Sequence, residues 1–451
     1  MARLVEEVIT RAREPRNGAG PFWAFGSPPL ARLDAEGTLA VTVPETSTEV
    51  RPLCNTRLRV FARRPGASWN ETFRGDEVDQ REPCPVAVLP GGRLYVSTNP
   101  RTATLHEEPD GSSTAWYCSP RVLAFETLAP GAVPRVLVPA WDEPWPFTDH
   151  SYRGIASDPA RGELLLLNIE GNLYTGSDPG RYHWCLMDGD GRTHANGLLE
   201  FPVRGCYPAV ALRGRRAVVL AVSDIAEPNA AWAAHKRQAL GLKWDYDFRR
   251  LFLAEAPDLG AGGFGPTLLV DSVEETAGHI RHCDLVMDGE GSLHVLYLRR
   301  STWKTSLRDR FFPGLPIEVA LCYAKVAGGR VVDRRVLAAC REDPGAPLRD
   351  PAGPLGPWGR GEAFRTADPL PLCAALHAGP GGVRAVCRDS AGMSVAALDG
   401  ARRRLDSGTP LDLFQAGSAR NGSFVAPDAL DLIGASAESP ELIRYASIPL
   451  G

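Results

Sequence analysis

The chain has 451 residues, of which 44% are hydrophobic and 23% are charged, and its formal net charge is −4. This is the composition of an ordinary globular protein, and the lack of a basic excess argues against a nucleic-acid partner. No run of about 18 apolar residues is present, so we expect no membrane-spanning segment and no membrane partner.

The amino-terminal stretch 1–9 is too short and too charged to be the apolar part of a signal peptide. We therefore expect a cytoplasmic protein, or a secreted or periplasmic one whose signal peptide is missing from this sequence. Residues 1–20 are interpreted as a lead outside the main domain, a short helix followed by a glycine-rich stretch.

One pattern recurs along the rest of the chain: a short apolar run, a glycine-containing turn and a second strand-like run. The clearest copy spans residues 281–297, where the turn is Asp288-Gly-Glu-Gly291. Weaker copies begin near Pro29, Cys84, Tyr152, Tyr207 and Cys373, and a poor one begins near Ser423. Seven such units are therefore present.

Seven units with room for four strands each predict an all-β fold, a seven-bladed β-propeller of four-stranded antiparallel blades. Residues 21–451 would form this single domain, with insertions near 227–243, 301–316 and 342–371. The first insertion has a helical composition, and the last is rich in proline and glycine. A β-sandwich or several small β domains are the alternatives.

Unit starts that are far apart in sequence meet in a propeller, because the first strand of each blade lines the central channel. Tyr152, Tyr207 and His282 occupy equivalent starting positions in three consecutive units. We expect these three side chains to converge at one pole. The candidate residues beside them or in the insertions are His150, Arg153, Arg281, Arg300, Lys304, Trp232 and Trp244.

The stretch from His282 to Tyr297 contains an apolar run followed by Asp-x-x-Gly-x-Leu-His-Val-x-Tyr. It resembles the blades of neuraminidase-repeat propellers among the polysaccharide lyases, such as ulvan lyases and rhamnose–glucuronate lyases. The resemblance implies an enzyme that cleaves an acidic, uronate-containing polysaccharide or oligosaccharide by β-elimination. It also implies that histidine and tyrosine transfer the protons while arginine neutralises the carboxylate.

The chemistry of elimination accounts for these residue types. Removing the proton α to a carboxylate requires that its charge be masked, which a bidentate arginine does well. A histidine near its unperturbed pKa accepts that proton at neutral pH. We assign His282 as base and Tyr207 as acid, roles that the two can exchange, and Arg153 as carboxylate clamp.

Further roles are predicted for the neighbouring residues. His150 is a candidate second base, and Tyr152 belongs to the same catalytic group. Arg281, Arg300 and Lys304 would bind the acidic substrate. The tryptophans Trp232 and Trp244 would form a wall against which sugar rings stack.

Other interpretations remain open. Tyr152 and Tyr207 can be packing residues that plug the channel, and His282 can be a structural histidine. The chain can instead be a glycoside hydrolase, although such enzymes need two carboxyl groups and no carboxylate occupies a unit start. A propeller that binds glycan or protein without catalysis is the third possibility.

No cofactor is expected to be required. The ten cysteines form no Cys-x-x-Cys pair and are interpreted as buried thiols. A structural zinc ion near the unit starts remains an alternative, because four cysteines lie at or beside those starts. A calcium ion near the Asp188-Gly-Asp-Gly191 turn is another, although the rest of a calcium loop is missing.

Overall fold

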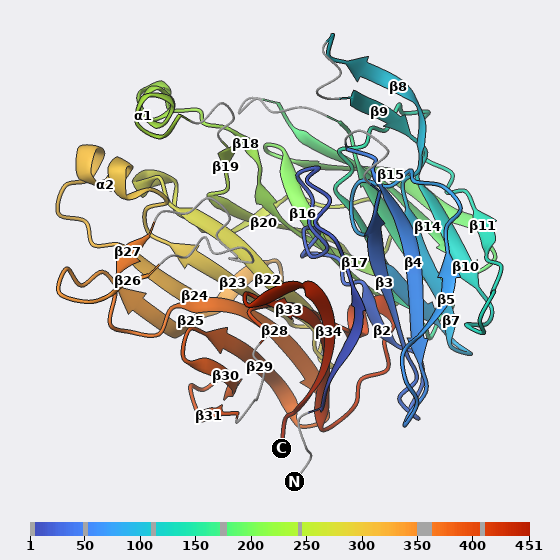
Figure 1. Cartoon of the computed structure of the whole chain (residues 1–451). Coiled ribbons are helices and arrows are strands. Elements are labelled where there is room, and N and C mark those ends of the chain that lie inside the picture. Colours follow the sequence, from blue (N-terminus) through green and yellow to red (C-terminus); the bar gives the residue numbers. More distant parts are fainter. Residues whose placement is uncertain are drawn as a thin grey trace.

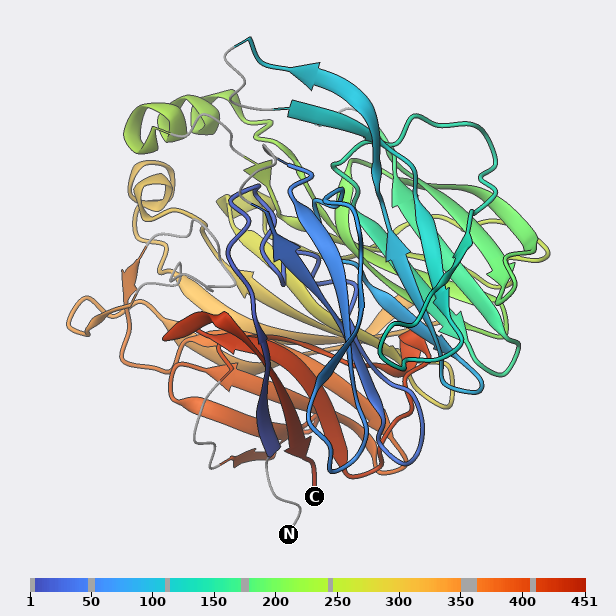
Figure 2. The same ribbon diagram turned by 45° about the vertical axis from the view of Figure 1, so that its right-hand side comes forward.

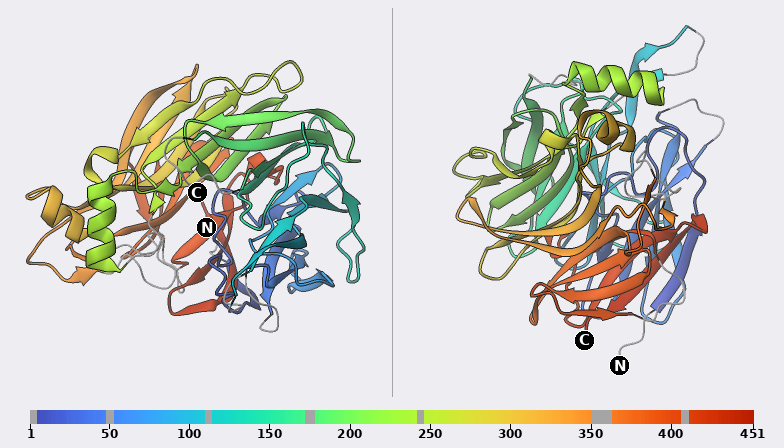
Figure 3. Two further views of the ribbon diagram at one scale, coloured as in Figure 1. Left: turned by 90° about the horizontal axis from the view of Figure 1, so that it is seen from above. Right: turned by 90° about the vertical axis from the view of Figure 1, so that its left-hand side faces the viewer.

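The computed structural model describes residues 5–47, 53–109, 114–171, 178–241, 246–349, 363–405 and 411–451. Over these ranges, seven four-stranded antiparallel sheets are arranged radially around a central axis (Figures 1 and 3). The predicted seven-bladed β-propeller is therefore confirmed.

In the first six blades the strands follow one another outward from the axis in chain order. Blade one is β2 (Leu30–Arg32), β3 (Leu39–Thr46), β4 (Thr56–Arg63) and β5 (Asn70–Arg74). Blade two is β6 (Val86–Leu89), β7 (Arg93–Thr98), β10 (Arg121–Phe125) and β11 (Arg135–Leu137). Blade three is β12 (Arg153–Asp158), β13 (Glu163–Ile169), β14 (Gly180–Asp188) and β15 (Thr193–Phe201).

The next three blades repeat this order. Blade four is β16 (Gly205–Arg213), β17 (Arg216–Ser223), β20 (Arg250–Ala256) and β21 (Leu268–Ser272). Blade five is β22 (His279–Met287), β23 (Leu293–Arg300), β24 (Glu318–Ala327) and β25 (Arg330–Arg341). Blade six is β28 (Pro371–Gly379), β29 (Gly382–Asp389), β30 (Gly392–Ala397) and β31 (Arg402–Arg404).

The burial of each strand follows its place in the blade. The second strand of a blade packs against neighbouring blades on both faces, so β17 is apolar and buried over nearly its whole length. The outermost strand β25 alternates between half-buried and exposed residues and carries several arginines. Charged outer strands discourage pairing with other chains.

The seventh blade is closed by the two ends of the chain. It consists of β32 (Leu413–Ala416), β33 (Ala429–Ser436), β34 (Ser439–Pro449) and, outermost, β1 (Val5–Arg11). Strand β1 pairs antiparallel with β34 (Figure 2). The prediction of a helix here was wrong: the free edge of β34 supplies hydrogen-bond partners, and this pairing overrides local preference.

Short elements decorate the propeller. The helix predicted in the first insertion is confirmed as α1 (Ala230–Leu240). Asn229 caps its amino end, and Gly241, a glycine in the left-handed conformation at φ +61°, caps its carboxyl end. The second insertion contains α2 (Thr305–Phe311). The remaining elements are β8 (Arg101–Glu107), β9 (Thr114–Cys118), β18 (Ile225–Ala226), β19 (Tyr246–Asp247), β26 (Leu348–Arg349), β27 (Phe364–Arg365) and the 3₁₀ turns Glu274–Thr276 and Ala419–Asn421.

Helices α1 and α2 lie beside each other at one pole of the propeller, and the β8–β9 hairpin rises from the same side (Figures 1 and 3). We call this the helical pole. Within the described ranges, no helix is both long and apolar enough to cross a bilayer.

Candidate functional site

The structure brings Tyr152, Tyr207 and His282 together at the helical pole. The ring centres of Tyr152 and Tyr207 are 4.7 Å apart. The ring of Phe25 lies 4.1 Å from that of Tyr207 and 5.0 Å from that of His282. The meeting of the unit starts at one point thus follows from the propeller geometry.

Irregular backbone aims two of these side chains inward. The pairing of β16 with β17 shifts between Cys206 and Ala209, and that of β22 with β23 shifts between His282 and Asp284. Tyr207 lies in the first of these irregularities with φ +53°, which is costly for a side chain of its size. Its surroundings must therefore hold it in place.

The connection from β1 to β2 covers the three side chains. In it, Trp23 stacks on Tyr152 with ring centres 5.0 Å apart, and Phe25 stacks on Tyr207. We call Trp23 and Phe25 the plug. Gly26 lets the plug descend this far, because a Cβ there would clash with the carbonyl of Tyr207. Tyr152, Tyr207 and His282 were expected to face solvent at this pole. The half-buried plug residues do so instead.

Below the plug, the predicted acid and base are buried. Tyr152, Tyr207 and His282 are 4%, 8% and 0% exposed. The Nε2–H of His282 donates to the carbonyl of Tyr207 at 2.6 Å, and burial lowers the pKa of His282 to about 3. Burial also raises the pKa of both tyrosines well above the usual range. The predicted proton transfers would require the plug to move.

The predicted clamp, Arg153, joins two blades. Its guanidinium donates to the carbonyl of Pro83 at 3.0 Å and to the hydroxyl of Ser151 at 2.9 Å, and it lies 3.6 Å from the carboxyl of Glu82. Burial raises the pKa of Glu82 to about 7. Arg153 is buried among these partners, so its contacts serve the packing of blade two against blade three.

Two half-buried histidines lie near the plug, and the ring centre of one, His150, is 6.0 Å from that of Trp23. Arg81 donates to Nδ1 of His150 at 2.5 Å and also pairs with Asp149 at 3.1 Å. Since Nδ1 accepts this bond, the ring proton of neutral His150 lies on Nε2. Burial, followed by the charges of Arg81 and Arg204, holds the pKa of His150 well below its usual range.

The second histidine, His279, lies among cations. It stacks on Trp303 with ring centres 4.1 Å apart. Burial, followed by the charges of Arg281, Arg300, Lys304 and Arg249, holds the pKa of His279 well below its usual range. We call these four cations the cationic wall. Three of its members, Arg281, Arg300 and Lys304, were predicted as substrate-binding residues.

Arg281 connects the cationic wall to the plug. Its guanidinium lies over the ring of Phe25, 4.4 Å from the ring centre, an arrangement that stabilises a partly desolvated cation. The side chain follows Ile280 in β22, one position before His282. The plug and the cationic wall are therefore in contact, and the four cations of the wall are buried, at 0–7% exposure.

The carboxylates around the plug and the cationic wall are paired with basic side chains. Asp224 pairs with Arg204, and Glu227 pairs with Arg249 and with Lys236. Asp247 lies 3.5 Å from Arg249, and burial raises its pKa to about 6. With Glu82 and Asp149 held by Arg153 and Arg81 as described above, no carboxylate among these five lacks a basic neighbour within 4 Å.

The predicted tryptophan wall is only partly described. Trp232 of α1 packs edge-on against Phe311 of α2 and against Phe312, which follows that helix. The guanidinium of Arg249 lies 4.9 Å from the ring centre of Trp232. The tryptophan side chain therefore holds the two helices together. Trp244 lies outside the described residues.

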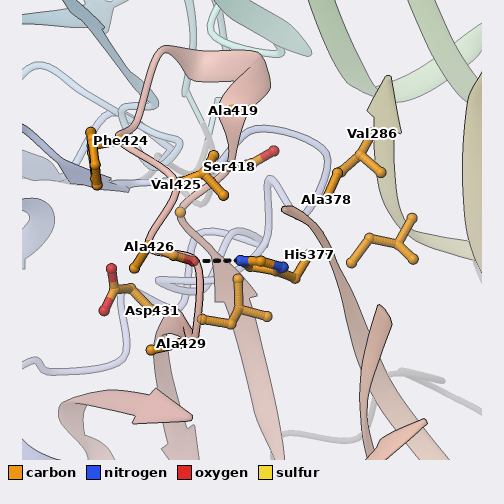
Figure 4. A pocket seen from close by; sticks show the side chains of 13 residues that line it. Val286, His377, Ala378, Ser418, Ala419, Phe424, Val425, Ala426, Ala429 and Asp431 are labelled. Carbon is orange, nitrogen blue, oxygen red and sulfur yellow. Dashed lines mark hydrogen bonds between the residues drawn. The ribbon is translucent and has the colours of Figure 1, made fainter. Parts of the chain in front are cut away.

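A small pocket lies away from the helical pole, between the ends of β22 and β28 and the loop after β32 (Figure 4). Its volume is about 20 Å³, and most of its lining is apolar. His377 there donates from Nε2 to the carbonyl of Ala426 at 2.7 Å. A space of this size holds about one water molecule, so it is no sugar-binding site.

The plug was missed by sequence reasoning, which gave Trp23 and Phe25 no role: they stand between the lead, residues 1–20, and the first unit, which begins near Pro29. A signal was present: Phe22, Trp23 and Phe25 stand close together between Gly20 and Gly26, with no alternation that would place them in a strand. Buried charged partners such as Arg204 and Asp224 had no comparable signal.

Comparison with known proteins bears on this fold. No protein-family model matches the chain, and no curated protein matches it in sequence. A Dyadobacter fermentans protein of unknown function covers 100% of this chain, and 99% of itself, at 10% identity and a TM-score of 0.47. The α-L-arabinanase of Penicillium chrysogenum, complexed with arabinobiose, covers 99% of both chains at 10% identity and a TM-score of 0.44.

A third solved structure is the α-L-arabinofuranosidase of Fusarium graminearum bound to an iminosugar inhibitor. It matches at 10% identity and a TM-score of 0.43, covering 81% of this chain and 92% of its own. Similarities at this level assign no substrate or reaction to this chain. The propeller implied by the resemblance to neuraminidase-repeat lyases is established by the seven sheets, whereas membership of the lyase families remains a prediction.

Proposed function

We propose that the helical pole binds the carboxylate of a uronic acid in an acidic glycan, and that the protein is a polysaccharide lyase. One observation supports this most: four cations lie around His279 beside the plug, and of these Arg281 stacks on Phe25 while Arg249 is already paired with Glu227. Aromatic faces stack on sugar rings, and guanidinium groups bind carboxylates.

Residues beside the plug take the roles first assigned to His282, Tyr207 and Arg153. Arg281 holds the uronate carboxylate, and His279 removes the α-proton from C5. The electron pair forms a double bond between C4 and C5 as the C4–O bond breaks. The departing oxygen receives a proton from solvent, and His150, whose ring proton lies on Nε2, would donate a hydrogen bond to it.

Substrate binding itself would activate the base. Burial, and after it the charge of the cationic wall, disfavours a protonated His279 in the free protein. A bound carboxylate offsets part of that positive charge, so the pKa of His279 rises towards its usual value. The imidazole becomes a stronger base only when the acidic sugar is present.

The test is incubation with a panel of uronate polymers, including polygalacturonate, alginate, glucuronan and ulvan. Elimination raises the ultraviolet absorbance, because the product is an unsaturated uronate, and the product masses show no added water. His279→Ala should abolish the rise, and His106→Ala, at an exposed histidine on β8, should not. No rise across the panel would refute the lyase.

A glycoside hydrolase is the second candidate, supported by two carboxyl groups with raised pKa values. Burial brings the pKa of Glu82 to about 7 and that of Asp247 to about 6, so each is partly protonated near neutral pH, as a general acid must be. Products that contain one added water per cleavage, lost in Glu82→Gln, would favour hydrolysis. Tight glycan binding without turnover would instead identify a binding propeller.

A further inference from the structure

Three carboxylates and one histidine converge on blade three, beside but separate from the plug. His183 lies on β14 and is fully buried, and Glu170 follows β13 directly. Asp142 and Glu143 come from the connection between β11 and β12. Donor atoms of Glu143, Glu170 and His183 all lie within 4.8 Å of one another.

The hydrogen bonds of His183 leave one position unexplained. Its Nδ1 lies 2.7 Å from the carboxylate of Asp142, which only accepts, so the ring proton is on Nδ1. Its Nε2 lies 3.1 Å from a carboxylate oxygen of Glu170. A lone pair and a carboxylate repel each other at that distance, so a positive charge must lie between them, either a proton or a metal ion.

The third carboxylate favours a metal ion. A proton on Nε2 would serve only the pair of His183 and Glu170, and would not involve the third donor, the solvent-exposed carboxylate of Glu143. The nearby cation, Arg181, already donates to Glu200 at 2.9 Å. A divalent ion would accept a lone pair from all three donors and offset the excess charge.

We propose that Glu143, Glu170 and His183 bind a first-row divalent cation, zinc or manganese, and that Asp142 orients the imidazole. A carboxylate on Nδ1 that fixes Nε2 as the ligand atom is the usual support of a metal-bound histidine. Two ligands about 2.1 Å from one zinc ion, at a tetrahedral angle, are about 3.4 Å apart, close to the observed separation of Nε2 and Glu170. Mixed imidazole and carboxylate ligands suit these metals better than calcium.

The ion would fasten a loop that reaches the helical pole. The connection that supplies Asp142 and Glu143 continues through Trp145 and Phe147, which enclose His183 at ring-centre distances of 5.6 and 5.4 Å. It then passes through Asp149 and His150 before β12 begins at Arg153. Metal binding would therefore hold His150 in place from a distance, without contacting a substrate.

The test uses the full chain without an affinity tag, freed of metal with a chelator. Zinc, manganese and calcium are added separately, with the stoichiometry read by calorimetry and the stability by thermal unfolding. We expect one equivalent of zinc or manganese to bind and to raise the Tm. Glu143→Gln should weaken binding at least about tenfold, since one charged ligand is lost, and should leave the metal-free Tm unchanged or higher because Glu143 is exposed.

His183→Gln should abolish binding, and His106→Gln, which removes the exposed partner of Glu108, is the matched control and should have no effect. If His183→Gln does not fold, Glu143→Gln decides the question. The proposal is overturned if neither zinc nor manganese binds at one equivalent, if calcium binds in preference to both, or if Glu143→Gln binds as tightly as the unaltered chain.

Discussion

Arg281 is the residue with which the proposed function can be tested most directly. It belongs to the cationic wall and lies over Phe25 in the plug. We expect Arg281→Ala to weaken binding of a uronate oligosaccharide by about 10- to 100-fold, the loss of one charge-assisted pair worth about 1.5–3 kcal/mol. The affinity of Arg281→Lys should lie between that of the unaltered chain and that of Arg281→Ala, because lysine keeps the charge but loses the bidentate geometry.

Calorimetry with a uronate oligosaccharide and with its neutral analogue measures this effect. The matched control is Arg335→Ala, at an exposed arginine that pairs with Asp333 on the outer strand β25. Equal losses of affinity for the acidic and the neutral sugar would show that Arg281 supports the plug and does not bind a carboxylate.

His282 should leave a signature in the pH dependence of stability. Its pKa is about 3 in the folded protein and about 6.5 when unfolded, so the unfolded chain binds more protons and stability falls as the pH drops below about 6.5. Relative to His282→Gln, the free energy of unfolding should decrease by about 1 kcal/mol between about pH 6 and pH 5.

Urea denaturation of both proteins at several pH values measures this difference. Histidines common to the two chains cancel in the comparison. If the free energy of unfolding changed with pH in the same way in both proteins, that would contradict the burial of a neutral imidazole at this position.

Residue types and their meeting point were accessible from the sequence, but solvent access was not. Equivalent positions in consecutive units located Tyr152, Tyr207 and His282 at one pole, because repeat geometry depends on spacing alone. Whether another segment covers them depends on a long-range contact of Trp23 and Phe25, which no local pattern encodes. The same holds for Arg153, whose partners Glu82 and Pro83 belong to a different blade.

At the scale of elements, the plug decides what the channel presents to solvent. We expect Phe25→Ala to lower stability by about 1–3 kcal/mol, because the ring is half-buried. It should also expose His282, which Phe25 contacts. Chemical modification of histidine, read by mass spectrometry, should label His282 in this variant and leave it protected in the unaltered chain.

Phe424→Ala is the control for this experiment, because Phe424 is an exposed aromatic residue beside the pocket of Figure 4, away from the plug. It should leave His282 protected. Rapid labelling of His282 in the unaltered chain would show that the plug opens by itself, and would return the buried His282 and Tyr207 to consideration as catalytic groups.

The contrast between α1 and β1 shows which elements a sequence reveals. Helix α1 was predictable, since its composition favours a helix and Asn229 and Gly241 cap it locally. Strand β1 was not, because its state depends on an edge supplied from the other end of the chain. The Arg444–Glu6 pair, 3.1 Å long, is one contact across that edge.

At the scale of the whole molecule, β1 joins the last blade to the first. We expect deletion of residues 1–11 to lower the Tm by roughly 5 °C or more, because an eleven-residue strand, β34, would lose its outer partner. Hydrogen exchange should locate the loss of protection in β34 and β33. The control, Arg11→Gln, removes only an exposed pair with Glu441 and should leave both measurements unchanged.

The architecture was the most predictable level of all. Seven copies of one pattern imply seven equivalent sheets, and a closed ring is a stable arrangement for them, because it leaves few free edges. Sequence reasoning placed six of the seven starts within a few residues of an inner strand. The seventh, near Ser423, was placed too late, since the inner strand β32 comes earlier and is only four residues long.

Closure by the two chain ends also sets an order of events during synthesis. Glu6 leaves the ribosome 438 residues before its partner Arg444 does, a delay of roughly 20–90 s at common translation rates. During that interval the first strand has no edge to join, and six blades must remain soluble as an open arc. Chaperone demand and misassembly should therefore peak late in translation, just before the final strand emerges.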